Sequence, residues 1–123
     1  MTFEIQTEQL SPDAFVVSPT GEVDLYTAPE LKQQLLDVVA RGARNVIVDF
    51  TDTTFIDSTA LGVLVGGVKR LRANDGSGSL TLVCADRNIT RIFEITGLDR
   101  IFPIYPTRDA AVSTLGAVPQ PAS

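Results

Sequence analysis

The sequence predicts an α/β fold with a largely parallel central sheet of about four or five strands, an antiparallel hairpin at its start and about four helices. Two observations support this prediction. Short apolar runs rich in β-branched residues alternate along the chain with segments whose apolar residues recur at helical spacing. The first two strand-like segments, in contrast, follow each other with no helix between them. Because the chain has 123 residues, we expect one domain.

The opening hairpin is predicted from two neighbouring segments. Residues 2–9 alternate apolar and polar side chains, which is typical of a strand with one buried face. Residues 14–19 form a short apolar run that ends at Pro19 and Gly21. The sequence Ser-Pro-Asp at 11–13 favours a tight turn between them, so the two strands should be antiparallel.

A helix should follow the hairpin. Thr27 can cap its first turn, and Glu30, three residues later, completes the pattern of a capping box. Pro29 lies in the first turn, where a missing N–H costs nothing. Gly42 suits the left-handed position at the helix end. The apolar stripe of this helix consists of Leu31, Leu35, Val38 and Val39.

The rest of the chain continues the alternation of buried strands and amphipathic helices. In order, we expect a strand over 45–50, a loop over 51–56, a helix with the apolar stripe Leu61, Leu64, Val65, Val68 and Leu71, a loop over 73–79, a strand over 80–84, a helix over 87–97 ended by Gly97, a weak edge strand over 100–105, and a helix over 107–115. Residues 117–123 are predicted to be a disordered tail, which leaves residues 1–116 as the domain.

The composition excludes several classes of function. The chain has no histidine, which removes Ser-His-Asp and Cys-His catalysis and most zinc sites. A net charge of −5 argues against binding to nucleic acid or to anionic membranes. No apolar stretch is long enough to span a bilayer, and no secretion signal is visible. Cys84 lies in an apolar run, which is typical of a core thiol in a reducing cytoplasm. Because histidine is missing, we also expect a protein that is not an enzyme and needs no metal or cofactor.

The segment FIDSTALGVLVGG, residues 55–67, is the most informative for function. Ser58 falls where a loop after a buried strand meets the start of a helix, at the sheet edge that most often carries function. The first N–H groups of a helix are unpaired and its start is electropositive, so a phosphate on Ser58 would be tolerated locally. A partner docked over this edge would meet the new charge. The alternative is that Asp57 or Ser58 only caps the helix.

Three glycines in this helix also need an explanation. Gly62, Gly66 and Gly67 each cost about 1 kcal/mol relative to alanine in a helix interior. Gly62 and Gly66 lie one turn apart on the same side, so a partner could approach the helix there, or a neighbouring helix of the domain could pack closely. The basic residues Lys69 and Arg70 that follow are either solvated or pair with acidic groups of a partner.

Two blocks of the sequence, GEVDLYTAPELKQQL at 21–35 and FIDSTALGVLVGGVKRLRANDG at 55–76, together resemble the STAS domain of bacterial anti-sigma factor antagonists. The resemblance runs from about residue 3 to residue 115. It implies that the chain binds an anti-sigma factor that is also a serine kinase of the histidine-kinase-like ATPase fold, and so frees a sigma factor. The kinase would switch the antagonist off by phosphorylation, and a PP2C-type phosphatase would restore it.

The resemblance also implies roles for individual residues. Ser58, preceded by Asp57, matches the phosphorylated serine of the family, and Asp24 matches an aspartate that lies close to it. Thr59 is a second hydroxyl that could accept phosphate. Ala60 stands where the family pattern often has glycine, which puts only local flexibility in doubt. We expect the partner-binding residues to be Asp24, Asp57, Ser58, Thr59, Gly62 and Gly66.

Three alternative functions compete with this interpretation. Asp49 ends a central strand, as the phosphorylated aspartate of a receiver domain does, but the acidic pair and late lysine that receivers need are missing. Catalysis with Ser58 as nucleophile would need a nearby base, and Lys69 lies too far along the helix. A STAS scaffold or sensor module in a stress-signalling complex is the remaining alternative to a free-standing antagonist.

Overall fold

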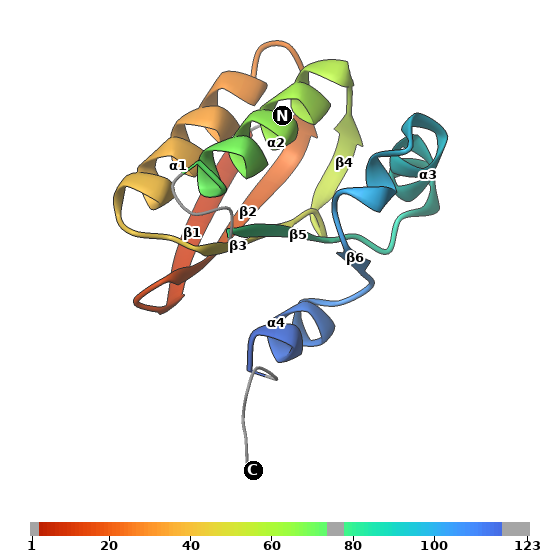
Figure 1. Ribbon diagram of the computed structural model, residues 1–123. Helices are drawn as coiled ribbons and strands as arrows, with labels where there is room; N and C mark the ends of the chain where they lie inside the picture. Colours follow the sequence, from red (N-terminus) through yellow and green to blue (C-terminus); the bar gives the residue numbers. More distant parts are fainter. Residues whose placement is uncertain (1–2, 74–77, 117–123) are drawn as a thin grey trace.

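The computed structural model describes residues 3–73 and 78–116. They form a six-stranded sheet in the order β1-β2-β3-β5-β6, with β4 beside β2, and helices pack on both faces (Figure 1). The predicted tail at 117–123 lies outside the described residues. The elements are β1 (Glu4–Ser11), β2 (Ala14–Val23), α1 (Ala28–Ala40), β3 (Asn45–Asp49), β4 (Thr53–Ile56), α2 (Ser58–Leu71), β5 (Ser79–Val83), α3 (Arg87–Thr96), a short 3₁₀ helix (Leu98–Arg100), β6 (Ile104–Tyr105) and α4 (Arg108–Gly116).

The predicted topology is confirmed. β1 and β2 pair as an antiparallel hairpin, with Glu4 opposite Thr20. β2 pairs with β3, β3 with β5, and β5 with β6, all in parallel. The weak strand expected over 100–105 is a two-residue edge strand, β6, which begins directly after Pro103. Because all the central strands run the same way, their carboxyl ends share one edge of the sheet.

One strand was not predicted. Residues 51–56 were expected to be a loop, but Thr53–Ile56 forms β4, which runs parallel to the last part of β2. The Thr53 hydroxyl donates a hydrogen bond of 2.9 Å to the carbonyl of Pro19, which fixes the start of this strand. Only the first and last of these four residues are buried, so the strand is too short to show an alternation of apolar and polar side chains. The sheet therefore has one strand more than expected.

The ends of α1 differ partly from expectation. The capping box is wrong, because the Thr27 side chain makes no hydrogen bond to the first turn of α1. Its hydroxyl instead donates to the carbonyl of Glu22 at 2.6 Å and accepts from the N–H of Asp24 at 2.9 Å. At the other end Gly42 has φ 99°, in the left-handed region, as predicted.

The two faces of the sheet are covered unequally. Helices α1 and α2 lie side by side on one face and cover the main hydrophobic core, to which α3 also contributes, while α4 lies against the opposite face (Figure 1). The alternation along β3 shows the division. Val46 and Val48 belong to the core under α1 and α2, whereas Ile47 packs with Val16 and Ala111 under α4.

Candidate functional site

The candidate site lies where β2 and β4 end together. Val23, the last residue of β2, is the register partner of Ile56, the last residue of β4. The N–H of Asp57 donates to the Val23 carbonyl at 3.3 Å. The turn that begins at Asp24 and the start of α2 therefore both follow directly from this pair of strand ends.

Asp57 caps α2. Its backbone is extended, and its Oδ1 accepts hydrogen bonds from the N–H of Thr59 at 2.8 Å and of Ala60 at 3.3 Å. A cap of this kind stabilises a helix by about 1 kcal/mol. The capping alternative is thus correct for Asp57. Ser58 is the first residue of the helix and is exposed, and within the described chain its hydroxyl has no hydrogen-bond partner.

This cap changes what a phosphate on Ser58 would meet. We expected unpaired N–H groups there, but those of Thr59 and Ala60 are already bonded to Asp57. The positive end of the helix still favours an anion, while the carboxylates of Asp57 and the neighbouring Asp24 repel one. A phosphate would therefore gain little from its own domain, and its main effect would be on the outward surface.

Asp24 organises the turn between β2 and α1. Its Oδ1 accepts hydrogen bonds from the N–H of Tyr26 at 2.9 Å and of Thr27 at 3.1 Å, and from the Thr27 hydroxyl at 3.2 Å. Partial desolvation alone would raise the pKa of Asp24, but these donors together outweigh it and lower the pKa below 3.8. Asp24 is therefore an ionised carboxylate at neutral pH, in the turn that follows the end of β2.

Large apolar side chains surround this edge, and the sequence reasoning missed them. Tyr26 is 84% exposed, Leu25 62% and Phe55 47%. Leu25 and Tyr26 follow Asp24 in the turn, and Phe55 lies on β4 three residues before Ser58. Two bulky apolar residues inside a turn motif were a signal that could have been read. The site combines a free hydroxyl, two carboxylates and exposed apolar surface, which suits a protein partner rather than a small substrate.

The remaining predicted site residues lie along a groove of about 890 Å³ between α1 and α2, which we call the α1–α2 groove. Thr59, Gly62 and Gly66 contribute to its lining. A Cβ added at Gly62 or Gly66 would meet nothing within 4 Å, whereas at Gly67 it would lie 3.2 Å from Leu35 and 3.3 Å from Leu80. Close packing inside the domain thus explains Gly67 alone. The six predicted partner-binding residues divide into an edge group and a groove group.

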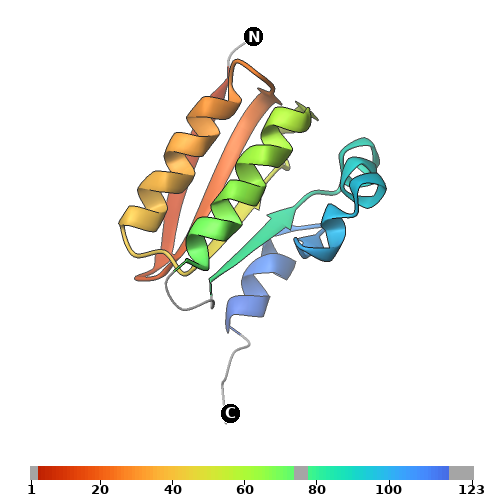
Figure 2. The same cartoon turned by 45° about the horizontal axis from the view of Figure 1, so that its top comes forward.

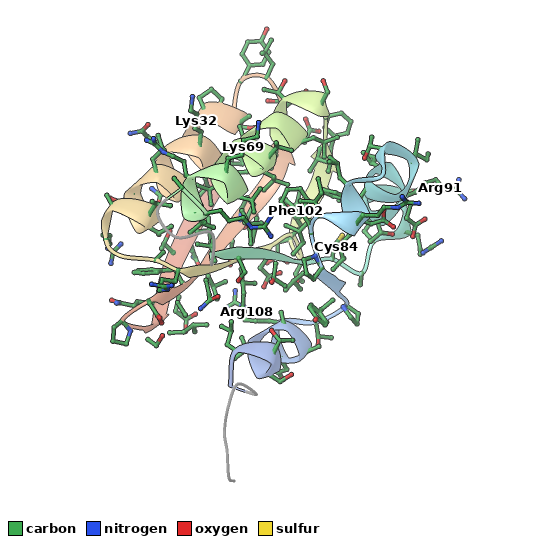
Figure 3. All side chains as sticks on the ribbon, in the orientation of Figure 1. Lys32, Lys69, Cys84, Arg91, Phe102 and Arg108 are labelled. Carbon is green, nitrogen blue, oxygen red and sulfur yellow. The ribbon has the colours of Figure 1, made fainter. Side chains whose placement is uncertain are left out.

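Asp49, the residue of the receiver alternative, has a structural role. Its side chain is 7% exposed and accepts hydrogen bonds from the N–H and hydroxyl of Thr51. The Nε of Arg108 lies 2.9 Å from it, and the same guanidinium also bonds to Glu8 and to Ser18. This network ties the start of α4 to the sheet, on the face opposite α1 and α2 (Figure 3).

Two further observations concern the described residues as a set. Residues 3–73 and 78–116 contain no group of three or more acidic, cysteine or histidine side chains that could hold a metal ion. Within the same ranges, no helix has the length and apolar character needed to cross a membrane.

Comparison with known proteins relates this arrangement to a family. Residues 4–111 match the family model of the STAS domain. An anti-sigma-B factor antagonist of Staphylococcus aureus is 38% identical over 95 residues, which are 76% of this chain and 86% of the relative. The protein of the same name from Staphylococcus epidermidis is 38% identical over 86 residues, or 70% of this chain and 78% of the relative.

Two solved structures are similar to the structure of this chain. An anti-sigma factor antagonist from Mycobacterium paratuberculosis superposes with a TM-score of 0.83 at 30% identity, covering 94% of this chain and 95% of that one. The unphosphorylated form of the anti-sigma factor antagonist SpoIIAA gives a TM-score of 0.75 at 18% identity, covering 94% of this chain and 100% of that one. The second likeness bears on the fold alone, and it matches the mixed sheet with its opening hairpin.

Proposed function

The chain belongs to the STAS domain family, and on that premise we propose that it is an anti-sigma factor antagonist whose affinity for its partner is set by phosphate on Ser58. The unmodified chain binds, in the cytoplasm, an anti-sigma factor that is also a serine kinase of the histidine-kinase-like ATPase fold, and so releases a sigma factor. The kinase breaks the bond between the β- and γ-phosphates of ATP and joins the γ-phosphoryl group to Ser58 Oγ, which loses its proton. A PP2C-type phosphatase hydrolyses the ester.

One observation carries this proposal. The Ser58 hydroxyl is exposed and unpartnered within the described residues, at the start of α2 and beside the Asp24 turn. Thr59, the second candidate acceptor, is half-buried and lines the α1–α2 groove, so its hydroxyl is less accessible to a kinase. The position supports transfer to Ser58 rather than Thr59.

The surroundings of Ser58 support a switch of affinity. Leu25, Tyr26 and Phe55 offer exposed apolar surface that a partner can bury, and aromatic side chains commonly dominate the energy of such interfaces. Asp24 and Asp57 make the same surface acidic. Phosphate adds a charge of roughly −1.5 to −2 and three oxygens at the centre of this contact. A docked partner would remove water from these charged oxygens, which is unfavourable. Binding should therefore weaken on modification.

The first experiment identifies the acceptor. The purified chain is incubated with ATP and the anti-sigma factor kinases of its own cell, and the modified residue is located by mass spectrometry. We expect one phosphate on Ser58, which the phosphatase removes. A phosphate on Asp49 or Thr59, or no transfer at all, would contradict the assignment.

The second experiment measures affinity for that kinase. Ser58→Ala should bind as the wild type does and resist modification, whereas Ser58→Asp should bind at least tenfold more weakly, which is about 1.4 kcal/mol. Thr54→Asp is the matched control, because Thr54 is an exposed residue of β4 and the substitution adds the same charge four residues before Ser58. If Thr54→Asp weakened binding as much as Ser58→Asp, general repulsion rather than a switch at Ser58 would explain the effect.

A further inference from the structure

The α1–α2 groove is long and mostly apolar. Its lining on α1 extends from Ala28 to Val39, and on α2 from Thr59 to Arg70, so it follows both helices over nearly their whole length. Eleven helical steps correspond to about 16 Å, or three turns. Figure 2 shows the two helices side by side above the sheet, and no other helix or strand of residues 3–73 and 78–116 covers them. The side chains of Leu36, Val39 and Val63 contribute to its apolar lining.

The charged residues of the groove are both basic. Lys32 and Arg70 line it, and none of the lining residues is acidic. Within the described ranges neither side chain makes an ion pair or hydrogen bond. Figure 3 labels Lys32 on α1 and Lys69, the neighbour of Arg70, on α2. Two cations beside an apolar floor favour an occupant that is apolar on one side and acidic at its margins.

The direction of the helices fixes the spacing of these charges. Both helices follow parallel strands and run the same way, so Ala28 and Thr59 mark one end of the groove. Lys32 is one turn from that end and Arg70 is three turns from it. The two cations are therefore about two turns, or roughly 11 Å, apart along the groove.

The partner segment in the groove must pair its backbone N–H and C=O groups within itself. Both walls of the groove are α-helices whose N–H and C=O groups are bonded internally, so the walls cannot pair with an extended strand. A helix brings its backbone hydrogen bonds with it and lays an apolar face into such a groove. Gly62 and Gly66 allow it close to α2, since the space above each is open.

We propose that the α1–α2 groove binds an acidic amphipathic α-helix of a protein partner. An apolar stripe about three turns long packs between α1 and α2, and two carboxylates seven residues apart pair with Lys32 and Arg70. The groove begins at Thr59, next to Ser58, and runs from there along the two helices. The inference goes beyond the phosphate switch and does not depend on it.

The test uses synthetic helical peptides of known sequence. The acidic peptide is a stapled 15-residue helix with a leucine stripe and two glutamates seven residues apart, labelled with a fluorophore. The control peptide has lysine in place of both glutamates. Binding is measured by fluorescence anisotropy at physiological salt, where screening over about 8 Å limits repulsion from the net charge of −5. We expect the acidic peptide to bind at least tenfold more tightly, with NMR shift changes centred on Gly62 and Gly66.

Variants of the chain sharpen the test. Gly66→Leu fills the groove and should weaken the acidic peptide more than tenfold without loss of the fold, because a side chain there meets open space. The double variant Lys32→Glu/Arg70→Glu should reverse the preference in favour of the basic peptide. Ser58→Asp should leave the affinity within twofold of wild type.

Four results would overturn the proposal. They are equal binding of the two peptides, shift changes centred on Tyr26 and Ser58 instead of the groove, unchanged binding by Gly66→Leu, and a tenfold loss in Ser58→Asp. The last result would show that groove and edge are one surface. A failure of the kinase experiments on Ser58 leaves the peptide measurements unaffected, so the two proposals fail separately.

Discussion

Replacing Gly62 and Gly66 by alanine should stabilise the fold. Both glycines are inside α2, where glycine costs about 1 kcal/mol relative to alanine. A Cβ at either position meets nothing within 4 Å, so no packing cost offsets the gain. We expect each single variant to raise the free energy of unfolding by about 1 kcal/mol. The two positions share no packing partner, so the double variant should gain about 2 kcal/mol.

Gly67→Ala is the matched control in the same helix. Its Cβ would lie 3.2 Å from a methyl group of Leu35 and 3.3 Å from one of Leu80. Both contacts are closer than ordinary van der Waals packing, so the two leucine side chains must shift within a packed core. We expect this cost to cancel the gain in helix propensity, leaving the stability close to that of the wild type.

The stability of the four variants is measured by urea unfolding and by thermal melting. For a chain of this length, entropies of unfolding scale to roughly 0.26 kcal/mol per kelvin, so 2 kcal/mol corresponds to about 8 °C in Tm. If Gly67→Ala gained as much as Gly62→Ala, the internal contact would not be the reason for that glycine. If Gly62→Ala or Gly66→Ala were destabilising, the open space beside them would have been misjudged.

Three further predictions concern the charged and titratable groups. Arg108→Ala should cost about 2 kcal/mol in urea unfolding, because it leaves the buried carboxylate of Asp49 unpaired, whereas Arg87→Ala, which breaks only an exposed ion pair with a separation of 3.7 Å, should change stability by less than about 0.5 kcal/mol. Hydrogen bonds lower the pKa of Asp24 in the folded state, so the stability that its carboxylate contributes is present above the unfolded pKa of about 3.8 and is lost as the pH falls through the folded pKa. When the free energy of unfolding is measured against pH, the Asp24→Asn variant should therefore lose less of it below about pH 4 than the wild type does. Burial raises the pKa of the Cys84 thiol, aided by the charges of Asp86 and Asp49 and opposed by a backbone hydrogen bond at Asp86. A thiol reagent at pH 8 should therefore label it at least about a hundredfold more slowly in buffer than in urea, and equal rates would contradict its burial.

Much of the fold could be predicted from the sequence because local periodicity determined most of it. The apolar run of β3 and the stripes of α1 and α2 each fix an element and its buried face. β4 could not be predicted, because a four-residue strand takes its structure from pairing with β2 and not from its own pattern. The capping box failed for a similar reason. Thr27 has the expected residue type, but the carbonyl of Glu22 and the N–H of Asp24 compete successfully for its hydroxyl.

The candidate site could be predicted in position but not in composition. The sequence placed Ser58 at a helix start after a buried strand and gave Asp57 as a possible cap, and the structure has both in these positions. The exposure of Tyr26 depends on the direction that the turn takes after β2, and local sequence does not determine that direction. The pairing of Asp49 with Arg108 joins residues 59 positions apart, so it appears only when the chain is folded.

The continuity of β2 has a consequence for how a signal leaves this domain. One ten-residue strand pairs with β1, β3 and β4, and its last residue supports both the Asp24 turn and the start of α2. The candidate site therefore follows a strand that pairs with three others of the described chain, and it has little freedom to rearrange. We therefore expect the domain to stay rigid on phosphorylation. The phosphate would block part of an unchanged binding surface, and the conformational change would occur in the partner.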